Sequence, residues 1–181
     1  KPTRSRSFSE REFPGSTFKV VTATAGVERG GVTAEEPVYP VTAAYQAAGI
    51  GTPIGNFGGG SCGGTLFVIL QDSCNTAFAQ MGVENAQASG MTATAEAFGL
   101  NQDVPIDLPG AEQSRWPTEI VTDNPPFLAQ ASIGQNEVQA TPLQMALVAA
   151  AVANDGKVMR PHVMREIRDD QNDVIDSYDP A

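Results

Sequence analysis

The segment 141–156 carries the clearest secondary-structure signal in the chain, and it constrains the fold more than any other stretch. Thr141 is a favourable N-cap residue, and Pro142 suits the first turn of a helix. The residues that follow are mostly small or apolar until Asn154-Asp155-Gly156, where the helix is predicted to end. The sequence therefore predicts one well-delimited helix in its C-terminal third.

Three more helices are predicted upstream. Ser16 is a good N-cap for a helix over 17–29, which a Gly-Gly pair ends. The other two are expected at 76–82 and near 92–98, the second closed by a glycine. The apolar run 65–72 fits either a short helix or a strand, because periodicity alone does not decide between them.

The remaining segments are rich in Gly, Pro and polar residues. Residues 32–64 are predicted to be irregular with one short hairpin, and 101–127 a long surface loop. Residues 157–181 contain one strand-like stretch at 163–167 and an acidic tail. Solvated surface is the expectation for such a tail.

Composition, charge and the length of the apolar runs argue against three classes of protein. Hydrophobic residues make up 41% of the chain and charged residues 18%, which is typical of a globular protein rather than a disordered one. The formal net charge of −10 argues against nucleic acid as a partner, because phosphate binding needs a basic face. The longest apolar run, 145–153, falls far short of the ~20 residues that cross a bilayer.

Ser16 and Lys19 form the first candidate catalytic pair. Residues three apart on a helix share a face, so the Lys19 amine is expected one turn from the Ser16 hydroxyl. The neighbouring residues are apolar, and burial lowers the pKa of a lysine, which then acts as a general base toward serine. A Ser followed by Lys at this spacing is common by chance, however, and Ser16 as a cap with Lys19 reaching solvent is the simpler alternative.

Ser73 and Asn75 form a second candidate pair. They belong to the only Ser-x-Asn in the chain, at a predicted helix entrance. The first and third side chains of an extended tripeptide point the same way, so a hydroxyl and an amide are expected to face one cleft. Capping of the next helix is the alternative role for either residue.

Four segments, in order along the chain, resemble the penicillin-binding proteins. Pro-Gly-Ser-Thr-Phe-Lys at 14–19 is similar to that family's first active-site motif, and Ser-Cys-Asn-Thr-Ala-Phe at 73–78 to its second motif and the helix after it. Ser-Ile-Gly-Gln at 132–135 and Thr-Pro-Leu-Gln-Met-Ala at 141–146 resemble segments typical of the transpeptidases. Four ordered matches are far more specific than any one of them.

The resemblance implies a peptidoglycan D,D-transpeptidase that works through a serine acyl-enzyme, without cofactor or metal. Ser16 would attack the penultimate D-alanine carbonyl of a stem peptide, and Lys19 would accept its proton. Ser73 would pass a proton to the departing D-alanine, and Asn75 would orient the acyl group. The backbone amide of Ser16 would form half of an oxyanion hole.

The same resemblance implies partners and a location. A second stem peptide would resolve the acyl-enzyme through its amine, and a β-lactam would acylate Ser16 instead. The expected partners are peptidoglycan stem peptides, β-lactam antibiotics and other cell-wall synthesis proteins. The expected place of action is the extracytoplasmic face of a bacterial cell membrane, with any anchor outside this chain.

The family's third motif, Lys-Thr-Gly, is absent, because the three lysines are followed by proline or valine. In the family this motif lies on a sheet strand beyond the region covered here. We therefore expect 1–181 to be a partial transpeptidase domain, with the missing sheet segment on the same polypeptide. The implied fold is α+β and β-lactamase/transpeptidase-like. This chain would be mostly its helical half, with few strands and much of the five-stranded antiparallel sheet missing. Such a half is expected to expose an apolar face and to be marginal or inactive alone.

Three other functions are alternatives to a transpeptidase. A serine β-lactamase of class A needs a further glutamate, and Glu112 and Glu119 lack its usual sequence context. A β-lactam sensor or non-catalytic binding domain would keep Ser16 and Lys19. Gly-Gly-Ser-Cys-Gly at 59–63 matches a nucleophile elbow, but glycines on both sides favour a flexible loop. The only histidine, His162, is expected at a strand entrance rather than in a site.

The two cysteines are too few for a disulfide scaffold, so a single bridge and two free thiols are both open. Because the family works outside the cytoplasm, where disulfides persist, the resemblance favours a Cys62–Cys74 bridge. Such a bridge would pin the glycine-rich loop to the second motif.

Overall fold

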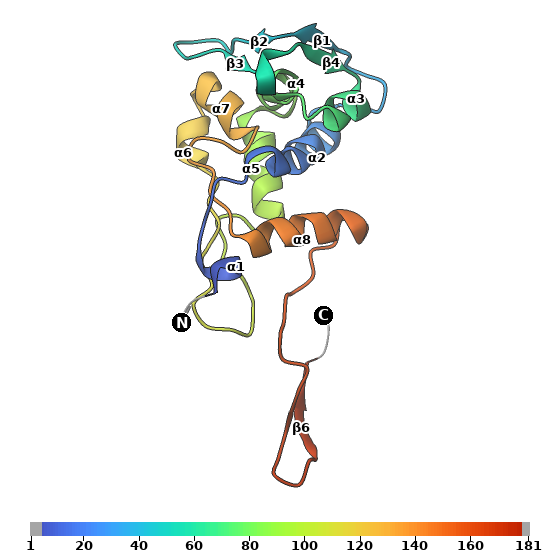
Figure 1. The fold of residues 1–181 in the computed structure, drawn as a ribbon, viewed down its shortest axis with the longest axis vertical. Helices are drawn as coiled ribbons and strands as arrows, with labels where there is room; N and C mark the ends of the chain where they lie inside the picture. The colour runs from blue at the N-terminus through green and yellow to red at the C-terminus, as the bar shows by residue number, and fades with distance from the viewer. Residues whose placement is uncertain (1–4, 179–181) are drawn as a thin grey trace.

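A computed structural model describes residues 5–178. Helices form the body of the molecule, short strand pairs lie along one edge, and a two-stranded hairpin extends from the opposite end (Figure 1). The helices are α1 (Arg6–Ser9), α2 (Lys19–Arg29), α3 (Leu66–Gln71), α4 (Asn75–Gln80), α5 (Gln87–Ala97), α6 (Thr118–Val121), α7 (Pro125–Ala131) and α8 (Pro142–Ala153). The strands are β1 (Tyr39–Thr42), β2 (Ala44–Tyr45), β3 (Ile54–Gly55), β4 (Cys62–Gly64), β5 (Glu166–Arg168) and β6 (Val174–Ser177).

The predicted fold class is confirmed. The described residues contain far more helix than strand, and their strands form three two-stranded antiparallel sheets, β1-β4, β2-β3 and β5-β6. No five-stranded sheet is present between residues 5 and 178. In the segment 32–64, where one short hairpin was expected, two of these strand pairs form instead. The ambiguous run 65–72 is a helix, α3.

Helix α2 lies at the centre of the body, and two of its faces are buried. Val21 and Ala25, one turn apart, pack into a core cluster with Phe18 and Trp116. The Phe18 and Trp116 rings stack with their centroids 5.5 Å apart. On another face, the Thr22 hydroxyl donates to the Ser132 carbonyl at 2.6 Å. This burial holds the start of α2, which carries the first motif, in a fixed place.

The expected N-cap role of Ser16 is wrong. Ser16 lies inside a 3₁₀ turn, η1 (Gly15–Phe18), whose N-cap is Pro14, and α2 begins only at Lys19. The tighter turn forms because Gly15 has φ +54° and donates its backbone N–H to the Gly134 carbonyl at 2.9 Å. The Ser16 hydroxyl is therefore free of a capping bond. The predicted end of the helix is confirmed, with Gly30 as its C-cap.

The predicted helices at 76–82 and 92–98 are both longer than expected. Helix α4 continues into a π-helical stretch, η3 (Met81–Ala86), and α5 already begins at Gln87. The glycine at the end of the first prediction does not stop the helix. A Cβ on Gly82 would contact the Ser132 hydroxyl, so this glycine allows close packing between helices.

The segment 101–127 is not simply a surface loop. It contains the short helix α6, and its Trp116 side chain is only 2% exposed. The Asn101 side chain bonds both backbone groups of Trp116, at 2.9 and 3.0 Å. The proline-rich composition predicted a surface loop. The large aromatic side chain of Trp116 instead anchors this segment in the core.

Helix α8 begins as predicted. The Thr141 hydroxyl accepts the Gln144 N–H at 3.1 Å, Pro142 occupies the first turn, and Asn154 is the C-cap. Its inner face buries Gln144, Val148 and Ala151. No helix within residues 5–178 is long and apolar enough to cross a membrane.

The C-terminal strand prediction needs a correction. Strand β5 covers Glu166–Arg168 rather than 163–167, because the Asp107 carboxylate accepts the N–H groups of Val163 and Met164 and ties them to a loop. The acidic tail is largely solvent-exposed up to Tyr178, as expected, and it also forms β6 against β5; its last residues, 179–181, lie outside the described part of the chain. At the base of this hairpin, His162 stacks on Tyr178 with centroids 3.5 Å apart.

Candidate active site

The four predicted site residues meet around one amine. The Lys19 Nζ lies 3.0 Å from the Ser16 Oγ and 3.0 Å from the Ser73 Oγ. It also lies 2.6 Å from the Ser73 carbonyl oxygen and 2.6 Å from the Asn75 Oδ1. The Lys19 side chain is only 1% exposed, and its amine sits 5.8 Å from the centre of the Phe78 ring. The helix start and the second motif, more than fifty residues apart in sequence, therefore form one cluster.

The partners of the Lys19 amine fit its charged form and also its neutral form. The Ser73 carbonyl and the Asn75 Oδ1 only accept hydrogen bonds, so they take two N–H groups. A neutral amine has two N–H groups and one lone pair, and that lone pair is then free to accept the Ser16 hydroxyl proton. Burial lowers the pKa of Lys19 to about 8. Desolvation thus shifts the balance toward the neutral amine, whose lone pair is available to a proton from the adjacent Ser16 hydroxyl.

Strand β3 orients the Asn75 side chain. Its Nδ2 donates to the Gly55 carbonyl at 3.0 Å, which turns the Oδ1 toward Lys19. The residue after it in sequence, Thr76, donates its backbone N–H to the Asn56 Oδ1 at 3.0 Å. Asn56 also donates to the carbonyls of Thr42 and Gly60. Sequence reasoning missed Asn56, since an isolated Asn in a loop carries no motif.

Gly134 supports the other side of the cluster. Its carbonyl accepts the Gly15 N–H next to Ser16, and its own φ is +71°. A Cβ at this position would meet the Gly15 carbonyl oxygen and would lie 2.8 Å from the Gly15 nitrogen. The segment 132–135, noted in the sequence only as a resemblance, therefore holds the turn that presents Ser16.

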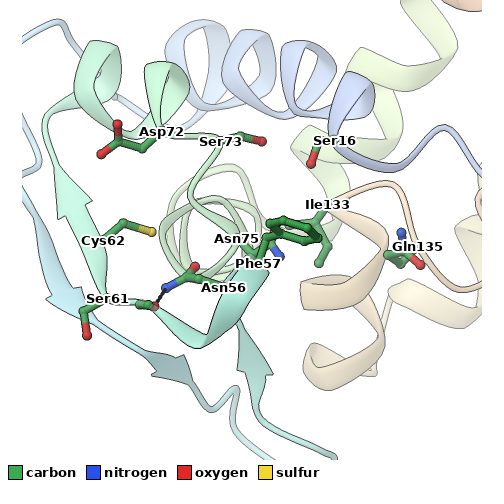
Figure 2. Close-up of a pocket in the computed structure, with 11 residues that line it drawn as sticks. Ser16, Asn56, Phe57, Ser61, Cys62, Asp72, Ser73, Asn75, Ile133 and Gln135 are labelled. Carbon is green, nitrogen blue, oxygen red and sulfur yellow. Dashed lines mark hydrogen bonds between the residues drawn. The ribbon is translucent and has the colours of Figure 1, made fainter.

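A cleft of about 710 Å³ opens beside the cluster. Figure 2 shows the Ser16 and Ser73 hydroxyls along one edge, with Asp72 beyond Ser73 and with Phe57 and Ile133 across from them. Lys19 lies beneath this surface, so a bound molecule would meet the two serines and Asn75 directly. The arrangement is suited to nucleophilic attack by a serine on a carbonyl carbon.

The Cys62–Cys74 bridge is confirmed, with an S–S distance of 2.08 Å and a Cα–Cα distance of 5.8 Å. It joins β4 to the residue between Ser73 and Asn75. The glycine-rich loop 59–63 is therefore tied to the second motif, and part of it pairs with β1. The nucleophile-elbow alternative finds no support, because His162 stacks on Tyr178 in the C-terminal hairpin.

We expect replacement of both cysteines by serine to lower the free energy of unfolding by about 3 kcal/mol. The bridge closes a loop with a sequence separation of 12 residues, and its loss restores that loop's entropy to the unfolded chain. Urea unfolding of the two proteins measures the difference. A reductant should lower the free energy of unfolding of the wild type to that of the double variant, and it should leave the value for the variant unchanged. Equal stability of the two oxidised proteins would contradict the expectation.

Comparison with known proteins identifies the family. Residues 1–180 match the family model of the penicillin-binding protein transpeptidase domain. The chain belongs to the penicillin-binding protein transpeptidase family. Among curated members, it is 38% identical over 179 residues to peptidoglycan D,D-transpeptidase PbpA of Mycolicibacterium smegmatis. It is 37% identical over 172 residues to PbpA of Mycobacterium tuberculosis strain H37Rv. Each alignment covers 92% of this chain and 34% of the relative, so this transpeptidase-family chain spans about a third of those proteins.

Solved transpeptidase-family structures share the fold. Penicillin-binding protein A from M. tuberculosis, as its penicillin G acyl-enzyme complex, superposes with a TM-score of 0.90 at 32% identity. That superposition covers 99% of this chain and 41% of the other. The D,D-transpeptidase domain of a peptidoglycan glycosyltransferase from Eggerthella lenta gives a TM-score of 0.88 at 30% identity, over 98% of this chain and 45% of that one. The resemblance drawn from the sequence motifs is thus confirmed at the level of family and fold.

Proposed function

We propose that the protein is a peptidoglycan D,D-transpeptidase in which Ser16 is the nucleophile. The observation that carries this proposal is the Lys19 amine, which lies 3.0 Å from both serine hydroxyls and 2.6 Å from the Asn75 Oδ1. The relatives at 37–38% identity are D,D-transpeptidases, and the M. tuberculosis neighbour forms an acyl-enzyme with penicillin G. Both facts support the proposal.

The reaction begins with proton transfer from the Ser16 hydroxyl to the neutral Lys19 amine. The Ser16 Oγ then attacks the penultimate D-alanine carbonyl of a stem peptide, and the backbone N–H of Ser16 helps to stabilise the oxyanion. When the C–N bond breaks, the Ser73 hydroxyl gives its proton to the leaving D-alanine amine. Lys19, 3.0 Å away, returns a proton to Ser73, and Asn75 orients the acyl group. The amine of a second stem peptide resolves the ester.

This mechanism predicts a pH dependence. We expect the rate of Ser16 acylation by benzylpenicillin to rise about tenfold per pH unit below 8 and to level off above it. The neutral amine is the active form, and burial sets the pKa of Lys19 to about 8. Rapid-quench measurements from pH 6 to 10 on the full-length protein check this, with the fold monitored by circular dichroism at each pH. A flat or falling profile would exclude Lys19 as the proton acceptor.

A serine β-lactamase is the competing enzyme class. Neither Glu112 nor Glu119 lines the cleft, so the structure offers no support for these glutamates as activators of a deacylating water. Incubation with a chromogenic β-lactam separates the two classes. A transpeptidase forms an adduct that persists, with little colour change beyond one equivalent, whereas a β-lactamase turns over many equivalents. A non-catalytic sensor would also keep its adduct, but it would fail to transfer a D-alanyl-D-alanine peptide to an amine.

We further propose that the chain is the helical half of a larger transpeptidase domain and that the third motif lies on the rest of the same polypeptide. Helix α8 supports this, because its outer residues Ala149, Ala150, Val152 and Ala153 are exposed although the helix is apolar almost throughout. An apolar helix face ordinarily requires a covering element. The proposed cover is the family's sheet, which would place the third motif across the cleft from Ser73.

The proposed place of action is the extracytoplasmic face of the bacterial membrane. The Cys62–Cys74 disulfide supports it, because such bridges persist in oxidising compartments. The curated relatives take part in cell-wall synthesis, which supports other cell-wall synthesis proteins as partners.

A further inference from the structure

Asn56 lies at the edge of the cleft, and its polar atoms are occupied by the protein itself. Its Oδ1 accepts the Thr76 backbone N–H at 3.0 Å. Its Nδ2 donates to the carbonyls of Thr42 and Gly60, at 2.9 and 3.0 Å (Figure 2). An amide side chain has two N–H donors, so Asn56 keeps no donor for a bound molecule although it lines the cleft. Any contribution of Asn56 to the reaction therefore passes through the residues that it holds.

The helix that follows the second motif depends on Asn56 for its cap. The N-cap residue of α4 is Cys74, whose side chain makes no capping bond and whose sulfur belongs to the disulfide. The first backbone N–H groups of a helix have no partner within the helix and need one from outside. Thr76 is at the second position of α4, and its N–H is bonded by Asn56 from an earlier segment. The residue after β3 thus replaces the side chain that caps a helix locally in other proteins.

The residue before Asn56 connects the same segment to the reacting atoms. The Gly55 carbonyl accepts the Asn75 Nδ2 at 3.0 Å. The Asn75 Oδ1 lies 2.6 Å from the Lys19 Nζ, which in turn lies 3.0 Å from the Ser16 Oγ. Two consecutive residues of one segment therefore hold two consecutive residues at the start of α4. Two adjacent bonds fix both the distance and the rotation between the segments, so a shift of Asn56 moves the Asn75 amide relative to the Lys19 amine.

We propose that Asn56 is a positioning residue for the acylation of Ser16, and that it acts by holding the Asn75 amide against the Lys19 amine. This inference rests on the proposed transpeptidase function. Proton transfer and nucleophilic attack depend on close alignment, so a small shift slows the reaction far more than it weakens the binding of a substrate. The disulfide also ties the loop after Asn56 to the second motif. Loss of the Asn56 side chain therefore changes the alignment of α4 without releasing the helix from the loop.

The test separates the rate of acylation from the affinity for the reagent. The full-length protein is mixed with benzylpenicillin at a series of concentrations, and intact mass after timed quenching gives the maximal acylation rate constant and the half-saturating concentration. The variants are Asn56→Ala, Asn75→Ala and the two combined. Asn124→Ala is the matched control, because Asn124 caps α7 by the same kind of bond, to the Phe127 N–H at 3.1 Å, and does not line the cleft. Urea unfolding gives the stability of each protein.

We expect Asn56→Ala to lower the maximal acylation rate constant by about 10–100-fold and to leave the half-saturating concentration within about twofold of the wild-type value. Asn124→Ala should lower the urea midpoint, as Asn56→Ala does, but it should be acylated like the wild type. In the Asn75→Ala background, Asn56→Ala should slow acylation by about threefold or less, because its effect passes through the Asn75 amide. A residue with a merely structural role would lower the stability without this coupling.

The proposal is overturned by an unchanged maximal rate constant in folded Asn56→Ala, by an equal loss in Asn124→Ala, or by an undiminished loss in the Asn75→Ala background. If circular dichroism shows that Asn56→Ala does not fold, Asn56→Gln is measured in its place. Glutamine keeps the amide but carries it one methylene further from the backbone, so a smaller loss in the same rate constant is expected, and no loss would again overturn the proposal. A wild-type protein whose Ser16 forms no acyl-enzyme would instead refute the proposed function itself.

Discussion

Replacement of Lys19 by Met should slow the acylation of Ser16 by benzylpenicillin by roughly 10²–10⁴-fold, the range lost with a general base. Met fills a similar volume but offers no lone pair to the Ser16 proton. It also leaves the Ser73 carbonyl and the Asn75 Oδ1 without the donors that now lie at 2.6 Å. Two unsatisfied acceptors should cost about 1–3 kcal/mol each in the free energy of unfolding. The rate is measured by intact mass after timed quenching, on the full-length protein.

Two further variants distinguish the loss of proton transfer from a loss of stability. Lys157→Met removes an exposed lysine outside the cleft and should leave the rate unchanged. Lys19→Arg keeps hydrogen-bond donors but stays protonated, so it should be as slow as Lys19→Met even where it restores stability. Wild-type acylation by the arginine variant would mean that Lys19 holds the cluster together without taking the proton.

Replacement of Gly134 by Ala should lower the free energy of unfolding by roughly 2–5 kcal/mol. Two costs add here. Its φ of +71° disfavours any side chain, and the new Cβ would meet the backbone of Gly15. The turn that presents Ser16 would have to shift, so acylation should slow as well. Thermal and urea unfolding measure the first effect, and quenched acylation the second.

Gly31→Ala is the matched control for the Gly134 variant. Gly31 has nearly the same φ, +69°, but no atom lies within 4 Å of a Cβ built on it. The Gly31→Ala substitution should lower the free energy of unfolding by only about 1 kcal/mol, which is the cost of a side chain on left-handed backbone. Equal losses for the two variants would show that contact with Gly15 contributes nothing.

The candidate site could be predicted from the sequence where its geometry is local. Ser16 and Lys19 lie three residues apart at the start of a helix, so their spacing alone predicts that they meet. Ser73 and Asn75 were joined to them only through the family resemblance, because nothing local brings residues so far apart together. The roles of Asn56 and Gly134 escaped prediction for the same reason. Their roles depend on contacts or on a cleft made by distant segments.

The fold could be predicted where end signals and packing agree. Thr141 and Pro142 mark the start of α8 through bonds made within four residues, and the structure has the same start. Gly82 was wrongly predicted to end a helix. It instead allows close contact with Ser132, which the local sequence does not reveal. Trp116 misled because prolines around it signalled a loop while its ring packs on Phe18. Strand β6 was missed because pairing with β5 depends on a partner rather than on its own acidic composition.

The most direct test of the central claim is the intact mass of the full-length protein before and after incubation with benzylpenicillin, with Ser16→Ala measured alongside. The cluster around Lys19 predicts one stable adduct on the wild type, located by peptide mapping to Ser16, and none on the variant. An adduct that survives the Ser16→Ala substitution, or a wild type that remains unmodified, would contradict Ser16 as the nucleophile of a transpeptidase.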